Sequence, residues 1–145
     1  MNSTSVSDCR KIELTPLKSV VGMTKILNVI EAHWIALTLL TLAVITVFSL
    51  WPESTAPMMP GTDKSHHLMA YAVLMFPAAL RKPERWIWIG LFFSAYGGVI
   101  EFLQPFVNRN GEWLDMAAST IGVVCGLIAA ELVKRFSQLF LKRFR

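Results

Sequence analysis

Four stretches of apolar residues divide the chain, and the first of them is the clearest. Between Glu31 and Glu53, 21 consecutive residues contain no Asp, Glu, Lys or Arg. Trp34 and Trp51 stand near the ends of this stretch, and tryptophan prefers the two interfaces of a bilayer. Because a hydrocarbon core about 30 Å thick is crossed by about 20 helical residues, the pattern predicts a transmembrane helix over about residues 32–51.

The three later stretches are less clean, because each approaches the length of a span only by including polar or charged positions. A segment with three prolines, residues 52–61, separates the first stretch from the second. Proline cannot continue a helix, so this segment is expected to be a loop. Three further spans are predicted, over about residues 64–80, 86–104 and 113–132.

The predicted fold class is therefore all-α, a polytopic membrane protein with a bundle of four transmembrane helices. Residues 32–132 form the membrane domain, 1–31 a cytoplasmic amphipathic N-terminal tail, and 133–145 a basic cytoplasmic C-terminal tail. The composition agrees, since 54% of the 145 residues are hydrophobic, 17% are charged, and the mean hydropathy is +0.49. Soluble proteins carry about 25% charged residues, and disordered chains combine low hydrophobicity with high net charge. Both classes are excluded.

The Lys and Arg residues set the expected orientation. With four spans, 12 of the 14 lie on one side of the membrane, and only Lys64 and Arg109 lie on the other. The positive-inside rule assigns the basic side to the cytoplasm, which predicts an inner (cytoplasmic) membrane protein with both termini inside. Counting the acids too gives +7 inside and −3 outside. The net charge of +4 and the pI of about 9.3 thus reflect topology, and we expect no nucleic-acid partner.

The two tails and the two cysteines add little chemistry. Apolar residues recur at helical spacing among basic ones between Leu17 and Ile30, and again after Lys134. Anchoring on the inner membrane surface is the expected role, with partner binding as the alternative. Cys9 and Cys125 show no CxxC or Cys/His spacing, so we interpret them as incidental free thiols.

Polar and ionisable residues gather at one predicted depth, near the outer ends of the last three spans. Inside a membrane such groups are costly and tend to mark function. Asp63, His67 and Tyr71 are four residues apart and share one helix face, whereas His66 lies about 100° round the helix from His67. We expect an outer-leaflet pocket whose ligand-binding residues are Asp63, Lys64, His67, Tyr71, Glu101, Gln104, Arg109, Asp115 and Ser119.

Glycines lie on the same helices as these polar residues. Gly122 and Gly126 belong to a run of small residues at every fourth position, and Gly97 lies in the preceding span. Small residues let helix backbones approach closely in lipid. We interpret all three as helix-packing residues that turn Glu101 and Asp115 into the bundle.

Three roles for the polar residues stay open at this point. In a structural clasp, Arg109 would bridge Glu101 and Asp115 and His67 would donate to either acid, because buried ions require pairing. In a binding pocket, the same groups would hold a headgroup, a lipid-linked sugar or a peptide. In an enzyme, the candidate catalytic residues are His67, Glu101 and Asp115. Histidine with two carboxylates could bind zinc, but HExxH-type spacing is missing, so we expect no metal and no cofactor.

Two motifs in this region resemble those of a known family. Residues 63–67, Asp-Lys-Ser-His-His, followed by Tyr71, resemble the DKxxHxxxY signature of VanZ-like membrane proteins. Glu101, Gln104 and Phe106 are similar to the ExxQxF motif of the same family.

A third motif follows in the last span. Arg109, Asp115 and Gly122 match the family's RxxxxxDxxxNxxG, except that Ser119 stands where the family usually has Asn. A serine hydroxyl can still donate and accept a hydrogen bond. The resemblance covers about residues 63–130, with the three motifs in order.

The resemblance implies a small polytopic protein of the cell envelope, in a family named for a teicoplanin-resistance factor. The expected function is a non-enzymatic, resistance-like envelope protein that binds a lipid-linked or cell-wall-active glycopeptide ligand in the outer pocket. One alternative is a membrane-embedded hydrolase or transferase that uses His67 with Glu101 or Asp115. The other is a purely structural clasp in a membrane scaffold. The expected partners are the lipid bilayer and that ligand, and a homo-oligomer is left open.

Overall fold

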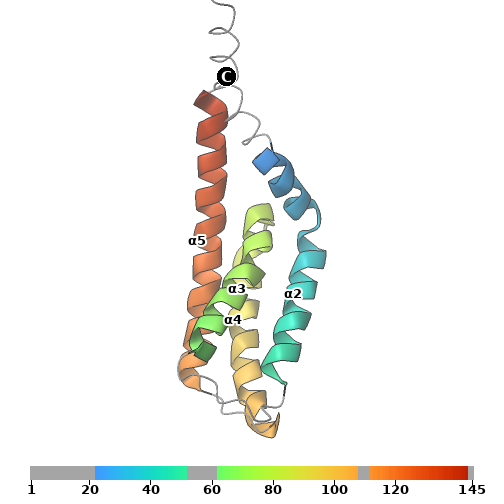
Figure 1. The fold of residues 1–145 in the computed structure, drawn as a ribbon, viewed down its shortest axis with the longest axis vertical. Coiled ribbons are helices and arrows are strands. Elements are labelled where there is room, and N and C mark those ends of the chain that lie inside the picture. The colour runs from blue at the N-terminus through green and yellow to red at the C-terminus, as the bar shows by residue number, and fades with distance from the viewer. Residues whose placement is uncertain (1–21, 52–61, 108–111, 144–145) are drawn as a thin grey trace, which may run out of the picture.

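The computed structural model describes residues 22–51, 62–107 and 112–143, and every element within these ranges is a helix (Figure 1). A short helix, Gly22–Ala32, precedes the main elements. These are α2 (Trp34–Ser49), α3 (Thr62–Arg81), α4 (Trp86–Leu103), the short 3₁₀ helix η1 (Gln104–Val107) and α5 (Trp113–Arg143).

Two of the described helices are long and apolar enough to cross a membrane. They are Trp86–Val107, which joins α4 to η1, and Trp113–Lys142 within α5. A third candidate joins Gly22–Ala32 to α2 across a bend of 74°. The prediction of an all-α membrane protein is confirmed at this level. By length and composition the described residues hold two spans, or three if the bent pair counts as one.

The polar helix α3 lies at the centre of the bundle. It packs most extensively against α5 and then against α2, with α4 also in contact. Its side chains make up most of the buried core, which comprises Ile45, Tyr71, Leu74, Met75, Ala78, Ala79, Leu80, Phe93, Val123 and Ala130. Because other helices cover so much of α3, little of its own surface has to be apolar. This explains why α3 alone does not reach the hydropathy of a span.

The ends of the helices differ from the predicted ranges at two places. The first predicted span, 32–51, is broken at His33, where Gly22–Ala32 turns away from α2. The fourth runs on as α5 to Arg143, without a break at the predicted start of the C-terminal tail. Residues 133–143 contain neither Gly nor Pro, so nothing in the sequence ends the helix there. Residues 1–21, including the predicted amphipathic segment from Leu17, lie outside the described residues.

The first described residues and the end of α5 lie at the same end of the bundle, which we call the terminal end (Figure 1). Two partly exposed ion pairs lie at this end: Lys134 Nζ lies 3.6 Å from Glu31 Oε1, and Lys82 Nζ lies 3.5 Å from Glu131 Oε2. The start of α3, the end of α4 and the start of α5 lie at the opposite end, which we call the distal end. Successive helices α2 to α5 therefore alternate in direction.

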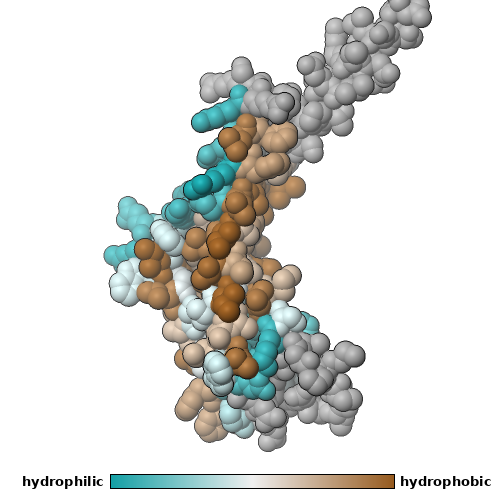
Figure 2. Space-filling view, turned by 90° about the vertical axis from the view of Figure 1, so that its left-hand side faces the viewer, coloured by the Kyte–Doolittle hydropathy of each residue, from teal (hydrophilic) through white to brown (hydrophobic). Residues whose placement is uncertain are grey.

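Apolar side chains cover much of the outer surface. Figure 2 views the side of the molecule that lies at the left in Figure 1, where apolar residues occupy the middle and hydrophilic residues gather toward the upper left and the lower end. Large side chains such as Leu132, Phe102 and Phe48 are at least 61% exposed. Apolar surface on this scale marks a membrane or protein interface rather than a water-facing surface.

The close contact between α3 and α5 depends on two glycines. A Cβ atom at Gly122 would overlap the carbonyl oxygen of Leu68, and one at Gly126 would overlap the carbonyl oxygen of Ala72. Both obstacles are backbone atoms of α3, so the two helices could not approach this closely with any larger residue. This contact sets the depth at which side chains of α3 meet those of α5.

Candidate functional site

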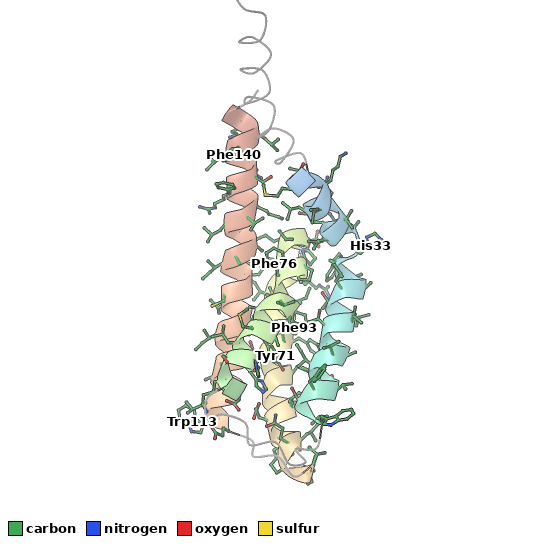
Figure 3. All side chains as sticks on the ribbon, in the orientation of Figure 1. His33, Tyr71, Phe76, Phe93, Trp113 and Phe140 are labelled. Atoms are coloured by element: carbon green, nitrogen blue, oxygen red, sulfur yellow. The ribbon has the colours of Figure 1, made fainter. Side chains whose placement is uncertain are left out.

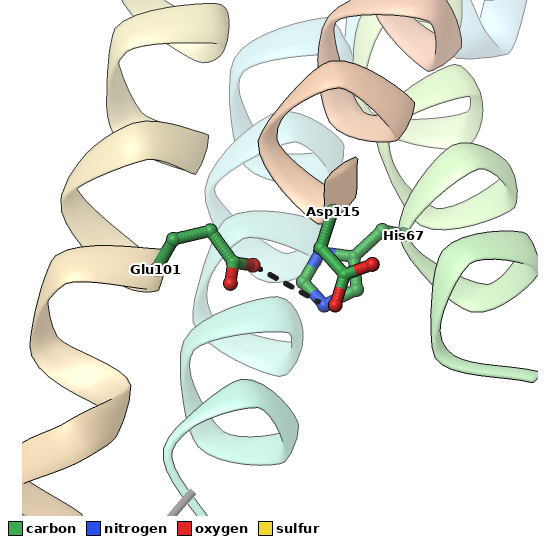
Figure 4. Close-up of side chains that lie close together, drawn as sticks. All are labelled: His67, Glu101 and Asp115. Carbon is green, nitrogen blue, oxygen red and sulfur yellow. Dashed lines mark ion pairs between the residues drawn. The ribbon is translucent and has the colours of Figure 1, made fainter. Parts of the chain in front are cut away.

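Three ionisable side chains from three different helices meet at the distal end of the bundle (Figure 4). His67 lies near the start of α3, Glu101 near the end of α4, and Asp115 in the first turn of α5. One ligand atom from each residue lies within 4.8 Å of the other two. Their exposed fractions are 7%, 8% and 4%, so all three are buried within the described part of the protein. We call these three residues the distal cluster.

The imidazole of His67 links all three helices. Its Nδ1 lies 3.3 Å from the Ser119 hydroxyl on α5, at the long end of hydrogen-bonding distance. Its Nε2 lies 3.6 Å from Oε1 of Glu101 on α4. The ring also stacks on Tyr71, with centroids 6.3 Å apart and planes 12° apart. These contacts fix the ring with one nitrogen toward Ser119 and the other toward the carboxylates.

The two carboxylates have different neighbours. Glu101 Oε2 accepts a hydrogen bond from the backbone N–H of Glu112, at 3.2 Å. Asp115 Oδ1 lies 3.8 Å from the ammonium of Lys64, which also donates to Oε2 of Glu112 at 2.6 Å. The Lys64–Glu112 pair is partly exposed, and such pairs stabilise a protein by about 0–1 kcal/mol. Lys64 therefore acts mainly as a nearby positive charge at the edge of the distal cluster.

Tyr71 closes the inner side of the distal cluster, one turn beyond His67 on α3. Figure 3 shows it between the helices, and its side chain is fully buried. The hydroxyl lies beside Ser119 and Glu101, but it does not reach hydrogen-bonding geometry with any described residue. A Cβ at Gly97 would lie 3.3 Å from this oxygen and 3.0 Å from Ser119 Cβ, so the glycine leaves space for both.

Six of the nine predicted ligand-binding residues thus lie in or beside one cluster: Lys64, His67, Tyr71, Glu101, Asp115 and Ser119. Gln104 is also buried, but its Nε2 donates toward the Ser49 carbonyl of α2 at 3.5 Å. Arg109 lies outside the described residues, so the predicted bridge from Arg109 to the two acids stays a prediction. Asp63 lies within α3, and its side chain is likewise outside the description.

Glu112 is a neighbour of the site that the sequence pattern did not indicate. It precedes α5 and reaches the site in two ways, through its backbone N–H to Glu101 and through its carboxylate to Lys64. The backbone contact carries no sequence signal. The charge pair could have been found by comparing Lys64 with the acids expected at the same depth.

The chemistry open to the distal cluster follows from its burial. Ser119, His67 and Glu101 form a chain of hydroxyl, imidazole and carboxylate, the residue types of a nucleophile, a base and an orienting acid. However, Ser119 is fully buried, so a substrate carbonyl has no path to its hydroxyl in this conformation. A small ion, or a polar group that enters from the distal end, could bind the imidazole and the carboxylates without reaching the Ser119 hydroxyl, which an acyl transfer would require.

A second concave feature lies elsewhere, between α2 and α4. A cavity of about 520 Å³ is lined by apolar side chains that include Trp34, Leu42 and Phe93, with Arg85 the one charged residue among those lining it. Without convergent reactive groups it offers space for a hydrocarbon chain rather than for chemistry. The distal cluster is the stronger candidate.

Comparison with models of known protein families finds no match, and neither curated proteins nor solved structures give one. The resemblance to VanZ-like proteins therefore rests on the motif residues alone.

Proposed function

We propose that this protein is a four-span integral membrane protein of the cytoplasmic membrane, with both termini in the cytoplasm and the distal cluster at the outer surface. In this proposal the cluster binds the polar part of a lipid-linked or cell-wall-active ligand, in the manner that the VanZ-like resemblance implies. The observation that carries the proposal is the burial of His67, Glu101 and Asp115 within 4.8 Å of one another.

The proposed membrane arrangement is supported by charge and helix direction. Described basic residues gather at the terminal end, where Lys82 and Lys134 lie in ion pairs across helices. The distal end carries the acids Glu101, Glu112 and Asp115. The positive-inside rule favours the basic end as cytoplasmic. The central position of α3 supports its inclusion as the second span, because a helix surrounded by others needs only a narrow lipid-facing strip.

The ligand-binding role is supported by the short distance of His67 and Asp115 from the ends of their helices. His67 is about five residues from the start of α3, and Asp115 is two residues from the start of α5. At 1.5 Å per residue, both lie within about 8 Å of a helix end. This is close to the headgroup level, where a polar ligand can reach them without crossing the hydrocarbon core.

The test uses the full-length protein in a susceptible host. Replacing His67, Glu101 or Asp115 with Ala, Gln or Asn, respectively, should lower glycopeptide tolerance while the amount of protein in the membrane stays normal. The matched control is His66→Ala, which removes an exposed imidazole one position away on the same helix. Loss of tolerance together with loss of protein would support a structural clasp instead. A C-terminal reporter found outside the cell would refute the proposed topology.

A membrane-embedded hydrolase or transferase is the second candidate, because His67 Nε2 lies 3.6 Å from the Glu101 carboxylate, which could orient the ring as a base. Turnover of an envelope lipid by purified protein, abolished by His67→Ala and kept by His66→Ala, would favour this candidate. Equal residual turnover in the two variants would remove it.

A further inference from the structure

We propose that the distal cluster is a site for one divalent transition-metal ion, coordinated by His67, Glu101 and Asp115. The donor set is one imidazole nitrogen and two carboxylate oxygens, presented by α3, α4 and α5 around a common point (Figure 4). The assignment does not depend on the ligand proposed above, because it concerns only the three side chains and the ion.

The separations between the donor atoms favour an ion between them. Zn–N and Zn–O bonds of about 2.0–2.2 Å place two ligand atoms of a tetrahedral site about 3.3–3.5 Å apart. His67 Nε2 and Glu101 Oε1 lie 3.6 Å apart, too far for a hydrogen bond but close to this value. All three donor atoms lie within 4.8 Å of one another, so binding an ion would require the most distant pair to approach by about 1 Å.

The surroundings of His67 match those of a metal ligand. A metal-bound histidine donates its other ring N–H to a nearby acceptor, which sets the tautomer and aims the free lone pair at the ion. Here Nδ1 faces the Ser119 hydroxyl at 3.3 Å, which leaves Nε2 on the side of the carboxylates. Ser119 is fully buried, so bulk solvent does not reach this contact.

Tyr71 provides an observation independent of the three ligands. Its hydroxyl is fully buried and lies near Ser119, but it does not meet any described residue in full hydrogen-bonding geometry. Leaving a buried hydroxyl unmatched costs about 1–3 kcal/mol in proteins. A water molecule on the open position of a three-ligand ion would match it, since such sites keep their fourth position for water or substrate.

The charge and the donor atoms of the cluster limit which ions the site would prefer. When both carboxylates are ionised they carry −2, which a dication neutralises. The imidazole favours Zn²⁺, Fe²⁺, Ni²⁺ or Cu²⁺ over Mg²⁺, Ca²⁺ and Mn²⁺, which prefer oxygen ligands. No thiolate lies in the cluster, so a soft monovalent ion such as Cu⁺ has no preferred donor. Lys64 lies 3.8 Å from Asp115 but 2.6 Å from Glu112, so it keeps its closer partner when a dication replaces it beside Asp115.

The test is a Zn²⁺ titration of the full-length protein, purified in detergent and stripped with a chelator. We expect one ion per chain with a dissociation constant at or below about 1 µM. His67→Ala, Glu101→Gln and Asp115→Asn should each weaken binding at least about 100-fold, since changes to outer-shell partners alone typically cost 10- to 100-fold. His66→Ala should bind as the wild type does.

A second measurement, made on wild-type protein and on His66→Ala, tests the site even if the ligand variants misfold. Co²⁺ added to wild-type protein should give visible d–d absorption, displaced by Zn²⁺, and the same signal should appear in His66→Ala. Failure of the wild type to bind Zn²⁺ stoichiometrically would overturn the assignment, as would His67→Ala and Glu101→Gln variants that fold normally and bind it unchanged. Stoichiometric Zn²⁺ binding with unaltered glycopeptide tolerance in the variants would refute only the proposed ligand role.

Discussion

Substituting the two glycines between α3 and α5 should destabilise the protein through backbone overlap. A Cβ at Gly122 would overlap the Leu68 carbonyl oxygen and lie 3.0 Å from Tyr71 Cβ. At Gly126 it would overlap the Ala72 carbonyl oxygen and lie 3.1 Å from Ala72 Cα. Since a backbone carbonyl cannot rotate away as a side chain does, Gly122→Ala and Gly126→Ala must each push the two helices apart.

The size of the effect follows from two opposing contributions. Overpacking of this kind costs about 1–3 kcal/mol, whereas replacing a helical glycine with alanine gains about 0.8–1.0 kcal/mol in helix propensity. The difference is about 0–2 kcal/mol, and we expect a net loss in the upper half of that range, about 1–2 kcal/mol, because both obstacles are backbone atoms. That loss lowers the ratio of folded to unfolded protein by about 5- to 30-fold.

The assay is thermal or denaturant unfolding of detergent-solubilised protein, followed by circular dichroism. For a chain of this length, 1–2 kcal/mol corresponds to a fall in the melting temperature of about 2–8 °C. Two glycines provide matched controls. A Cβ at Gly22 would have nothing within 4 Å, and the nearest atom to one at Gly90 would be a Val123 methyl at 3.7 Å. If Gly122→Ala and Gly126→Ala are as stable as Gly22→Ala and Gly90→Ala, the reasoning is refuted.

Two further predictions use the same unfolding assay. Tyr96→Phe removes the hydroxyl that pairs with Thr46 between α4 and α2. Because Thr46 keeps its bond to the Leu42 carbonyl, the substitution should lower the free energy of unfolding by about 0.6 kcal/mol, the average for such bonds in membranes. A loss above about 2 kcal/mol would mean that this contact is the main one holding α2. Glu112→Gln should change the free energy of unfolding by less than about 0.5 kcal/mol, because the backbone N–H of residue 112 still donates to Glu101. Lys64→Met also removes the positive charge 3.8 Å from buried Asp115 and should cost at least about 1 kcal/mol more. Equal effects of the two substitutions would show that Lys64 does not stabilise Asp115.

Much of the bundle could be predicted from apolar spacing. The stretch beginning at Trp86 became α4, and the one beginning at Trp113 became the first two-thirds of α5. The bend at His33 could not be predicted, because neither Gly nor Pro marks it. The continuation of α5 to Arg143 was hidden by a change from apolar to basic composition. Such a change marks where a helix leaves the membrane, not where it ends.

The distal cluster was predictable in part, for a geometric reason. Spacing within one helix places His67 and Tyr71 on one face, and the small residues of α5 indicate which face of that helix carries Asp115 and Ser119. The direction taken by Gln104 depends on α2, which no spacing within α4 reveals. The expectation of no metal rested on local motifs such as HExxH. Ligands contributed singly by three helices, as in the proposed site, would leave no such motif.

The polar groups of the distal cluster are not the only contacts between α3 and α5. Helices associate in lipid when small residues let their backbones meet, and Gly122 and Gly126 already provide this between α3 and α5. Replacing a buried ion pair with apolar residues is often neutral or stabilising. Between α3 and α5, a clasp that includes His67 and Asp115 would therefore add to packing that the glycines already supply. Binding an ion or a ligand gives these three residues a role that packing alone does not.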